Sequence, residues 1–383
     1  MTLDFSKLQG LKTPVYVYDR ALLEATLQEI KSCIEGKPVM VHYAVKANCN
    51  PEIMKMIAGA GFGADCVSGG EIKAAVAAGF APESICYAGV GKTDDEILTG
   101  VKAGIGFFNV ESIEELEILN AVAKEEGAVI NVALRVNPNI DAHTHLYITT
   151  GLEENKFGID LRLLDKAIDT VASMSNLELC GLHFHIGSQI TVMDPFVLLC
   201  EKINGLVEHY RKQGVEFKVI DVGGGLGIDY DNPDANPIPP FKAYFDTLLS
   251  HLHLGEGQTL HCELGRSIVG QCGSLLSRVT FVKEGIGKKF VILDAGMNDL
   301  MRPALYGAHH NIENLSAAAR HGAEEEVYDV VGPICESSDI FGKEERLPAT
   351  RRGDLIALRS AGAYGESMAS TYNMRPLPAS ILL

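Results

Sequence analysis

Eight short apolar runs that alternate with amphipathic stretches constrain the fold of this chain more than any other feature. The runs cover residues 39–46, 62–67, 84–89, 105–110, 130–137, 179–187, 217–225 and 259–265. Segments between them, such as 51–61 and 112–127, carry apolar residues with the 3.6-residue period of an amphipathic helix. Eight strands alternating with helices over about 250 residues form the repeat of a (β/α)8 barrel. No G-x-G-x-x-G motif follows the first run, so a dinucleotide-binding fold is disfavoured.

The pattern changes after about residue 265. Apolar runs at 273–285, 288–296, 325–335 and 353–365 are joined by short turns that contain Gly or Pro, which is typical of a β-domain. The segment 13–20 is also strand-like and precedes the first helix, so we expect it to pair into that domain. The sequence therefore predicts the α/β class: a TIM-type (β/α)8 barrel over 22–265, then a C-terminal β-domain over 266–383 into which residues 1–21 pair.

The charge of the chain bears on its partners. Lys and Arg total 33 against 50 Asp and Glu, a formal net charge of −17 over 383 residues. Such a surface repels nucleic acid and anionic membranes, so neither is an expected partner. No apolar run approaches the ~20 residues that a membrane span needs. The first ten residues lack the basic and apolar regions of a signal peptide, so we expect a cytoplasmic protein.

Nine cysteines are spread along the chain, and no two of them form a C-x-x-C pair. This spacing argues against a zinc ribbon or a thioredoxin-type site. An odd number of cysteines within apolar runs indicates reduced thiols, as in the cytosol. Cys335 follows a Gly-Pro turn and, taken by itself, is best explained as one more buried thiol.

Polar or special residues follow the carboxyl ends of six of the eight expected strands. Lys46 is the most unusual of them, because it ends a run that otherwise has the pattern of a buried strand, and burying an ammonium is costly without a partner or a chemical role. In a barrel these strand ends lie on one face, where active sites are built. The residues are Lys46, Asp65, Arg135, His185 with Ser188, Gly223–Gly225, and Glu263 with Arg266.

These residue types fit one cofactor, pyridoxal phosphate (PLP). The amine of Lys46 can form a Schiff base with its aldehyde, and an acid such as Glu263 can keep its pyridine nitrogen protonated. The glycines of "DVGGGLG" let the backbone approach a phosphate, although a tight strand–helix turn explains them equally well. His185 can lie flat on the ring.

Two H-x-H motifs, in "DAHTHLY" and "HFHIGSQ", leave a metal-dependent barrel hydrolase as an alternative. On a strand, each motif places two imidazoles on one face. No third ligand stands at a suggestive spacing, and Lys46 suits PLP chemistry better. No metal is therefore expected.

Nine motifs in order give the chain a resemblance to a known family. They are "YAVKAN", "RVNP", "ITTGLEENKFGI", "HFHIGSQI", "DVGGGLGIDY", "ELGRS", "RPALYGAHH", "VVGPICESSDI" and "GDLIALRSAGAYGESMAS". From about residue 13 to the end, the chain resembles the diaminopimelate decarboxylases, PLP enzymes of the alanine-racemase-like group with a barrel and a C-terminal β-domain. The resemblance implies decarboxylation of meso-2,6-diaminopimelate to L-lysine and CO2, the last step of lysine biosynthesis.

The resemblance also implies a role for each matching residue. Lys46 matches the lysine that carries PLP, His185 matches the histidine that stacks on its ring, and Glu263 matches the acid at the pyridine nitrogen. Cys335 matches the proton donor, which in this family reaches the site from the other subunit of a homodimer. The other cofactor-binding matches are Asp65, Arg135, Ser188, Gly223, Gly224, Gly225, Gly265, Arg266 and Tyr364. The substrate-binding matches are Arg266, Arg302, Tyr306, Glu336 and Tyr364.

The substrate expectation depends on charge. Cationic Arg266 and Arg302 suit the distal carboxylate of diaminopimelate, and anionic Glu336 suits its distal ammonium. A decarboxylase for carboxynorspermidine or arginine is the alternative within this fold, and a PLP carrier without activity is another. Glu263 disfavours a racemase, whose corresponding position resembles an arginine. The loop at 311–326 gives no clear pattern.

Overall fold

The computed structural model describes residues 5–138, 156–318, 320 and 324–383. The chain divides into two compact units, which are described separately. One consists of Leu27–Gly227 and Pro240–Gly265, and the other of Met1–Thr26, Ile228–Pro239 and Arg266–Leu383. Residues 228–239 therefore group with the second unit, whereas the sequence analysis placed them in the barrel segment.

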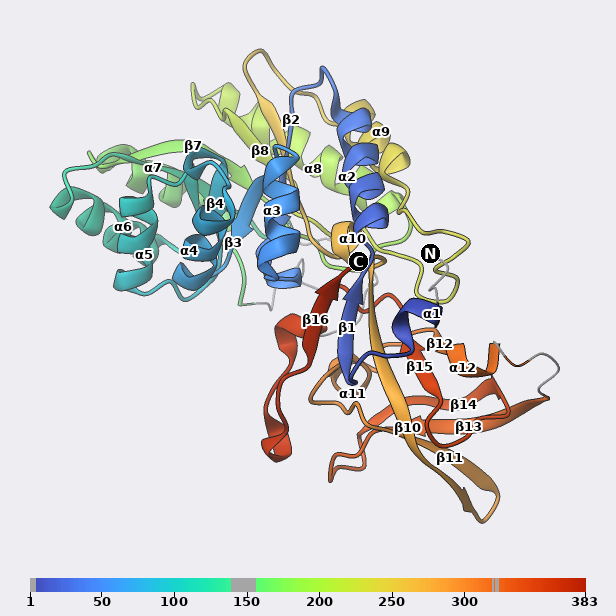
Figure 1. The fold of residues 1–383 in the computed structure, drawn as a ribbon. Helices are drawn as coiled ribbons and strands as arrows, with labels where there is room; N and C mark the ends of the chain where they lie inside the picture. Colours follow the sequence, from blue (N-terminus) through green and yellow to red (C-terminus); the bar gives the residue numbers. More distant parts are fainter. Residues whose placement is uncertain (1–4, 139–155, 319, 321–323) are drawn as a thin grey trace. The chain divides into compact units, whose positions relative to one another are not determined.

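The first unit is a closed barrel of eight parallel strands, which confirms the predicted fold (Figure 1). The ring closes because β2 pairs with β9, with Val41 opposite Cys262. Each strand overlaps the apolar run that predicted it, and all but β7, which begins two residues early at Leu177, lie within that run. The strands are β2 (Val39–Ala44), β3 (Gly63–Cys66), β4 (Ile85–Tyr87), β5 (Phe107–Val110), β6 (Ile130–Arg135), β7 (Leu177–His183), β8 (Val219–Asp221) and β9 (Thr259–Leu264).

Helices connect consecutive strands, and their ends follow local sequence signals. The side chains of Ser68, Thr93 and Ser112 accept a backbone N–H in the first turn of the next helix, which satisfies one of its unpaired donors. Gly79 and Gly104 end two helices in the left-handed conformation. The helices are α2 (Arg20–Ile34), α3 (Pro51–Gly59), α4 (Gly69–Ala78), α5 (Asp94–Ala103), α6 (Ile113–Glu125), α7 (Leu164–Ser173), α8 (Asp194–Arg211) and α9 (Phe241–His251).

The barrel interior contains a histidine pair among its apolar side chains. His42 Nε2 lies 2.8 Å from His261 Nδ1, and His42 Nδ1 lies 3.0 Å from the carbonyl oxygen of Ser84. The ring of Phe107 lies edge-on to both imidazoles. Burial lowers the pKa of His42 to about 4 and that of His261 to about 3. Both imidazoles are therefore neutral at pH 7.

The second unit is built on an eight-stranded sheet, in which β12, β15, β10, β11, β13 and β14 follow one another and β1 and β16 extend from β10. Its strands are β1 (Val15–Tyr18), β10 (Gly273–Gly285), β11 (Lys288–Leu293), β12 (Ile312–Asn314), β13 (Glu325–Val331), β14 (Ile340–Pro348), β15 (Leu355–Leu358) and β16 (Ala379–Leu382). Short helices accompany them: α1 (Phe5–Leu8), α10 (Arg266–Val269), α11 (Arg302–Tyr306) and α12 (Leu315–Ala318).

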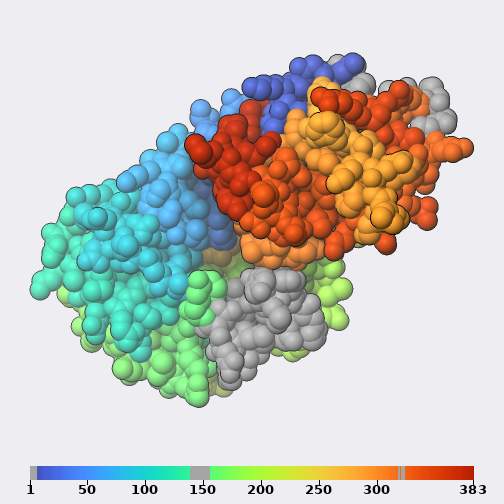
Figure 2. All heavy atoms as spheres, turned by 90° about the horizontal axis from the view of Figure 1, so that it is seen from below, coloured from blue at the N-terminus to red at the C-terminus, as the bar shows by residue number. Residues whose placement is uncertain are grey.

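The N-terminal strand β1 lies between β10 and β16 (Figure 1). It pairs antiparallel with β10, where Val15 is opposite Leu276, and parallel with β16, where Val15 is opposite Ala379. Val15, Val17 and Leu276 are buried in one apolar cluster with Leu355. The strand itself is buried, but in the space-filling view blue N-terminal residues lie beside orange and red C-terminal residues at the surface (Figure 2).

Three strands of this sheet, β12, β14 and β16, are not covered by any of the apolar runs given above. Neither β12 nor β14 was predicted, and both lie at an end of the ordered run of strands. β14 carries charged residues along its length and a Gly at its third position, so its pattern does not alternate between apolar and polar residues. In the described part of the chain, no helix is long and apolar enough to cross a membrane.

Candidate active site

Lys46 lies at the carboxyl end of β2, but in a short 3-10 turn (Val45–Ala47) and not in the strand itself. Its ammonium Nζ lies 2.5 Å from Oδ2 of Asp65, which is a residue of the neighbouring strand β3. The Lys46 side chain is 39% exposed, whereas that of Asp65 is fully buried. The predicted strand 39–46 therefore ends two residues early, at Ala44, and Lys46 follows it with its ammonium paired to a buried carboxylate.

Glu263 is the second-last residue of β9, and side chains of two other barrel strands hold its carboxylate. Asn109 on β5 donates its Nδ2–H to Oε1 at 3.1 Å, and Nε2 of His183 on β7 lies 3.3 Å from Oε2. All three side chains are buried. The contacts fix both carboxylate oxygens, so Glu263 presents a defined orientation at this end of the barrel.

Three buried carboxyl groups, those of Asp65, Asp221 and Glu263, share this end of the barrel, and their pKa values are shifted in different directions. Burial raises the pKa of Glu263, but the nearby His183 and Lys46 lower it by more, so its pKa falls below the ordinary value. Burial and the charge of Glu263 raise the pKa of Asp65 to about 6 and that of Asp221 well above its ordinary range. The pKa of Glu263 is thus lowered and that of Asp221 is raised, so Glu263 holds its negative charge more strongly than Asp221 does.

The glycine turn Gly223–Gly225 follows β8 and passes close to neighbouring backbone. A Cβ on Gly224 would lie 2.1 Å from the carbonyl oxygen of Glu263, and one on Gly223 would lie 2.3 Å from that of Phe184. Gly223 and Gly225 also have positive φ, 70° and 111°. Only glycine fits this path without displacing its neighbours.

The N–H groups of this turn are not all available to an anion. Gly223 donates to Asp221 Oδ1 at 2.8 Å, and Gly224 donates to His185 Nδ1 at 3.2 Å. For the N–H of Gly225, no acceptor is found among the described residues. A phosphate would therefore meet Gly225, while Gly224 orients His185. The segment with Ser188 lies alongside, because Ile190 and Leu226 form a bridge.

His185 follows β7 as a neutral imidazole. Burial and the charge of Arg135 lower its pKa to about 3. Its Nδ1 accepts the Gly224 N–H, so the ring proton lies on Nε2. The imidazole is thus held in one tautomer and one plane, as a group that packs against a flat ring requires.

Arg135 ends β6 and pairs with a buried acid. Its Nη1 lies 2.5 Å from Glu111 Oε1, and its guanidinium lies 4.6 Å from the centre of the Phe157 ring. Glu111 Oε2 accepts the N–H of Gly158 at 2.8 Å. Arg135 therefore connects β6 to the segment that starts at Lys156, and it adds positive charge near His185.

The second unit holds two buried arginines against one tyrosine. Nη1 of Arg266 donates to the Tyr230 hydroxyl at 2.6 Å, and the Arg302 guanidinium lies 4.7 Å from the centre of the Tyr230 ring. Arg266 also lies 4.9 Å from the ring centre of Tyr364, which has a positive φ of 56°. Burial lowers the pKa of Arg302. Two cations held this close favour an anionic ligand.

His310 fixes the position of Arg302. Its Nδ1–H donates to the carbonyl of Arg359 at 2.8 Å, and its Nε2 accepts from Arg302 Nη1 at 2.8 Å. Nε of Arg302 is buried with no hydrogen-bond partner among the described residues, so this guanidinium retains a free donor. Tyr306 ends the same short helix, α11, and is half-buried.

Cys335 and Glu336 lie together in an exposed loop between β13 and β14. The Cys335 N–H donates to Asn373 Oδ1 at 3.1 Å, and Glu336 Oε1 accepts from the Tyr372 hydroxyl at 2.5 Å. Cys335 is exposed, so the interpretation of this residue as a buried thiol is wrong. Within the described residues, neither Cys335 nor Glu336 forms a hydrogen bond, ion pair or ring contact with Arg266 or Arg302.

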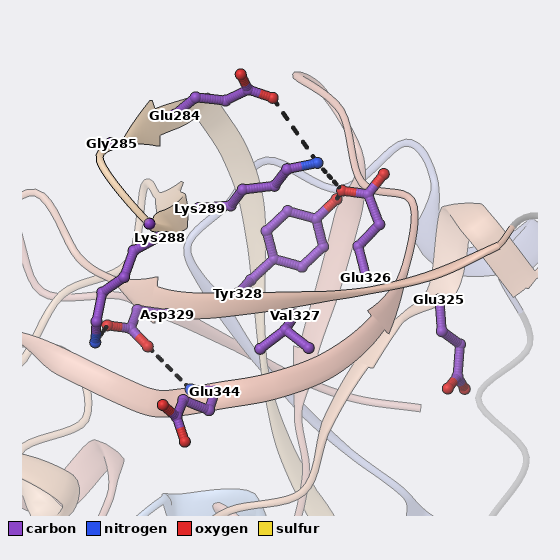
Figure 3. Close-up of a pocket in the computed structure, with 11 residues that line it drawn as sticks. Glu284, Gly285, Lys288, Lys289, Glu325, Glu326, Val327, Tyr328, Asp329 and Glu344 are labelled. Atoms are coloured by element: carbon purple, nitrogen blue, oxygen red, sulfur yellow. Dashed lines mark hydrogen bonds and ion pairs between the residues drawn. The ribbon is translucent and has the colours of Figure 1, made fainter.

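The second unit also has a pocket of about 570 Å³ (Figure 3). Lysines and acids of β10, β11 and β13 line it. Lys288 Nζ lies 2.9 Å from Asp329 Oδ2, and Lys289 pairs with Glu326, but five acids face these two lysines, so the described lining is negatively charged. None of the predicted site residues is among the described residues that line this pocket.

Several groups in these sites were missed by the sequence analysis. Asn109 is a polar residue inside an apolar run, and this was the one local signal available. His183 was considered only as a metal ligand, whereas the structure places it on Glu263. Tyr230 contacts Arg266, which is 36 residues away, and His310 contacts Arg302, which is eight residues away; neither spacing follows a helical or strand period. The motif at 141–147 lies outside the described residues.

Comparison with known proteins gives a consistent result. Residues 20–270 match the family described as pyridoxal-dependent decarboxylase, pyridoxal binding domain. The chain is similar to diaminopimelate decarboxylase of Bacteroides thetaiotaomicron, with 55% identity over 375 residues that cover 97% of this chain and 96% of that protein. Its fold matches the crystal structure of diaminopimelate decarboxylase from Helicobacter pylori complexed with L-lysine, with a TM-score of 0.92, 40% identity, and coverage of 99% and 94%. Lysine/ornithine decarboxylase of Vibrio vulnificus, at 21% identity and a TM-score of 0.83 over 99% of this chain and 96% of that chain, shares the fold.

Proposed function

The chain belongs to the diaminopimelate decarboxylases of the pyridoxal-dependent decarboxylase family, and we propose that the residues described above decarboxylate meso-2,6-diaminopimelate to L-lysine and CO2. The observation that carries this proposal is the group of side chains at the carboxyl ends of β2, β3 and β9. There Lys46 pairs with Asp65, and an ionised Glu263 lies inside the same barrel. An amine beside a buried acid and a separate ionised carboxylate suit a pyridine aldehyde.

The described groups fit PLP. Oδ1 of Asp65 is buried with no hydrogen-bond partner among the described residues, and the glycine turn has no room for any Cβ. When bound, PLP supplies an aldehyde for an amine and a ring that accepts the electrons released with CO2. Lys46 would hold the aldehyde, Glu263 the protonated ring nitrogen, and His185 one ring face. Gly225, Ser188, Gly265 and Arg266 are the candidates for the phosphate end, and Asp65 and Arg135 support them.

The chain's own groups would hold and move protons at defined atoms. Asp65, with a pKa of about 6, accepts a proton from Lys46 Nζ more readily than an exposed aspartate would. Glu263 keeps its charge because Asn109 and His183 bind its two oxygens. The Sγ–H of Cys335 would donate a proton to the substrate carbon that has lost its carboxyl group.

The distal end of the substrate would be bound by charge. Arg266 and Arg302 would bind the distal carboxylate, with Tyr306 and Tyr364 beside them. Buried guanidiniums bind carboxylates strongly because water competes little there. Glu336 would bind the distal ammonium. An amine-only distal end, as in ornithine, would leave both arginines without an anion, which disfavours such substrates.

We further propose a cytoplasmic homodimer with shared active sites. Cys335 and Glu336 are exposed, and within the described residues they form hydrogen bonds with Asn373 and Tyr372 but not with Arg266 or Arg302. In this proposal, the two residues therefore act in the active site of the partner subunit. All nine cysteines are free, as in a reducing compartment.

The test of the function is product analysis with purified protein and PLP. Separate incubations with meso-diaminopimelate, ornithine, arginine and carboxynorspermidine are followed by chromatographic quantification of each product, and zinc is measured by elemental analysis. Lysine from the first substrate alone is expected. Turnover of another substrate only would retain the cofactor chemistry and overturn the roles of Arg302 and Glu336. Bound zinc with no turnover would favour the hydrolase alternative.

A further inference from the structure

The turn at residues 372–374 has an unusual backbone. Asn373 and Met374 both have φ of 55°, so two consecutive residues other than glycine are left-handed. Such a conformation is costly and persists only where the surrounding structure imposes it. Asparagine tolerates it better than most residues, but methionine does not. The contacts of the turn with the rest of the domain must therefore hold it in this conformation.

The turn contacts the loop that carries Cys335 and Glu336, through one bond to each. Oδ1 of Asn373 accepts the Cys335 N–H at 3.1 Å. The Tyr372 hydroxyl donates to Glu336 Oε1 at 2.5 Å. The hydrogen bond to Glu336 raises the pKa of Tyr372, so the hydroxyl stays protonated and remains a donor.

Both ends of the turn are anchored to another part of the β-domain. The Ser370 N–H donates to the carbonyl of Asn298 at 2.8 Å, and Arg375 Nη2 donates to the carbonyl of Asp294 at 2.8 Å. The positions of Tyr372 and Asn373 are thereby defined relative to the sheet.

The other side of the Cys335 loop is fixed by Asp339. Its Oδ2 accepts the Ile334 N–H at 2.7 Å, and its Oδ1 accepts the Met297 N–H at 2.7 Å. These bonds fix the loop before Cys335 but reach neither the Glu336 side chain nor the Cys335 backbone. The turn supplies the contacts that Asp339 does not.

We propose that Tyr372 and Asn373 are positioning residues, Tyr372 for the Glu336 carboxylate and Asn373 for the Cys335 thiol. This inference rests on the proposed function, in which Glu336 binds the substrate ammonium and Cys335 donates the proton. The two roles separate: Tyr372 acts on substrate binding, and Asn373 acts on proton delivery.

Each role predicts a different kinetic effect. Tyr372→Phe removes only the hydroxyl, so KM for meso-diaminopimelate rises about tenfold while kcat changes by less than about twofold. Asn373→Gly keeps the left-handed backbone and removes the acceptor, so kcat falls about tenfold. Its solvent deuterium isotope effect on kcat also increases, because proton donation becomes slower. Asn373→Asp retains the acceptor oxygen and restores most of kcat.

Two matched variants serve as controls. Tyr210→Phe removes the same type of bond, a tyrosine hydroxyl 2.7 Å from Asp165 Oδ1, on α8 of the other unit. Met374→Gly changes the neighbouring residue, which has the same φ and a side chain that is 96% exposed. Both are expected to retain wild-type kcat and KM. A Met374→Gly variant as impaired as Asn373→Gly would overturn the role of the Asn373 side chain.

The wild-type assay is run first, so that the two levels of inference are distinguished. A wild-type protein that makes no lysine overturns the proposed function and this inference with it. If the wild type makes lysine, then unchanged KM in Tyr372→Phe overturns the first role. An unchanged kcat and isotope effect in Asn373→Gly overturn the second.

Discussion

The ammonium of Lys46 lies 2.5 Å from a carboxylate oxygen of Asp65, and the two partners differ sharply in exposure. The lysine side chain is 39% exposed, whereas Asp65 is fully buried. The nearby ammonium lowers the pKa of Asp65, but burial and Glu263 outweigh it and raise that pKa to about 6. A carboxyl that titrates this close to neutral pH can exchange a proton with the amine, and an amine reacts with an aldehyde only after losing its proton.

Lys46→Ala is expected to abolish covalent attachment of PLP. The wild-type protein is treated with borohydride, which fixes a Schiff base, and its peptides are analysed by mass spectrometry. A pyridoxyl adduct is expected on the peptide that contains Lys46 and is expected to be absent from the variant. Lys73→Ala, an exposed change on α4, is expected to keep the adduct. An adduct on another lysine in the wild type would exclude Lys46.

Glu263→Gln is expected to lower kcat/KM by about 10²- to 10³-fold, since it removes a fixed charge that stabilises the protonated ring nitrogen. PLP should still bind, which fluorescence titration of the cofactor measures. Asp221→Asn is the matched comparison, because Asp221 ends β8 in the same barrel, and burial and the charge of Glu263 raise its pKa. The asparagine variant should lose much less activity. Equal losses in both variants would contradict the assignment of the charge to Glu263.

Mixing Lys46→Ala with Cys335→Ala subunits is expected to restore activity. Each homodimer is inactive. After subunit exchange, about half of the dimers are mixed and each mixed dimer has one intact site, so about a quarter of wild-type activity returns. The recovery is measured after brief exposure to dilute urea, with each variant treated alone as a control. If mixing restores nothing although native mass spectrometry detects mixed dimers, Cys335 acts within its own subunit.

The buried pair His42 and His261 predicts acid sensitivity. Burial lowers the pKa of His42 from 6.5 to about 4. Between these values the unfolded chain binds a proton that the folded chain does not, so acid favours unfolding, by up to about 1.4 kcal/mol per pH unit. His42→Gln should remove this contribution. Buried carboxyl groups with raised pKa values make the folded protein more stable as the pH falls, but the wild type and His42→Gln share these groups, so their effect cancels in the comparison.

The measurement is urea unfolding of the wild type and His42→Gln at pH 7 and pH 5, at one protein concentration. The wild type should lose about 2 kcal/mol more than the variant on going from pH 7 to pH 5. Equal losses would mean that His42 titrates in the folded protein as it does in the unfolded chain.

The barrel could be predicted because its signal is local. Apolar runs such as 39–46 and 259–265 are strands buried on both faces, and each is separated from the next by an amphipathic helix. The strand ends indicated Lys46, Asp65 and Glu263 together, since the closed barrel of parallel strands brings its carboxyl ends to one face.

What could not be predicted depends on contacts that follow no helical or strand period, whether the partners are eight or 36 residues apart. β14 is polar along most of its length and is a strand because β13 pairs with it. The contact of Arg302 with His310, and that of Glu336 with Tyr372, are set by tertiary structure and not by any local period. The same holds for Tyr230, which lies in a segment that the sequence pattern assigned to the barrel.

The pairing of β1 with β16 has a consequence for the order of events during synthesis. Val15 is made early, yet its partner Ala379 is made only after the whole barrel has left the ribosome. The barrel strands Val39–Leu264 can close among themselves in the meantime, because their partners all lie within that stretch. Until then, one edge of β1 remains unpaired, and an unpaired edge is where one unfinished chain would pair wrongly with a second chain. The β-domain is therefore the later part to assemble, and it is the part that carries Cys335.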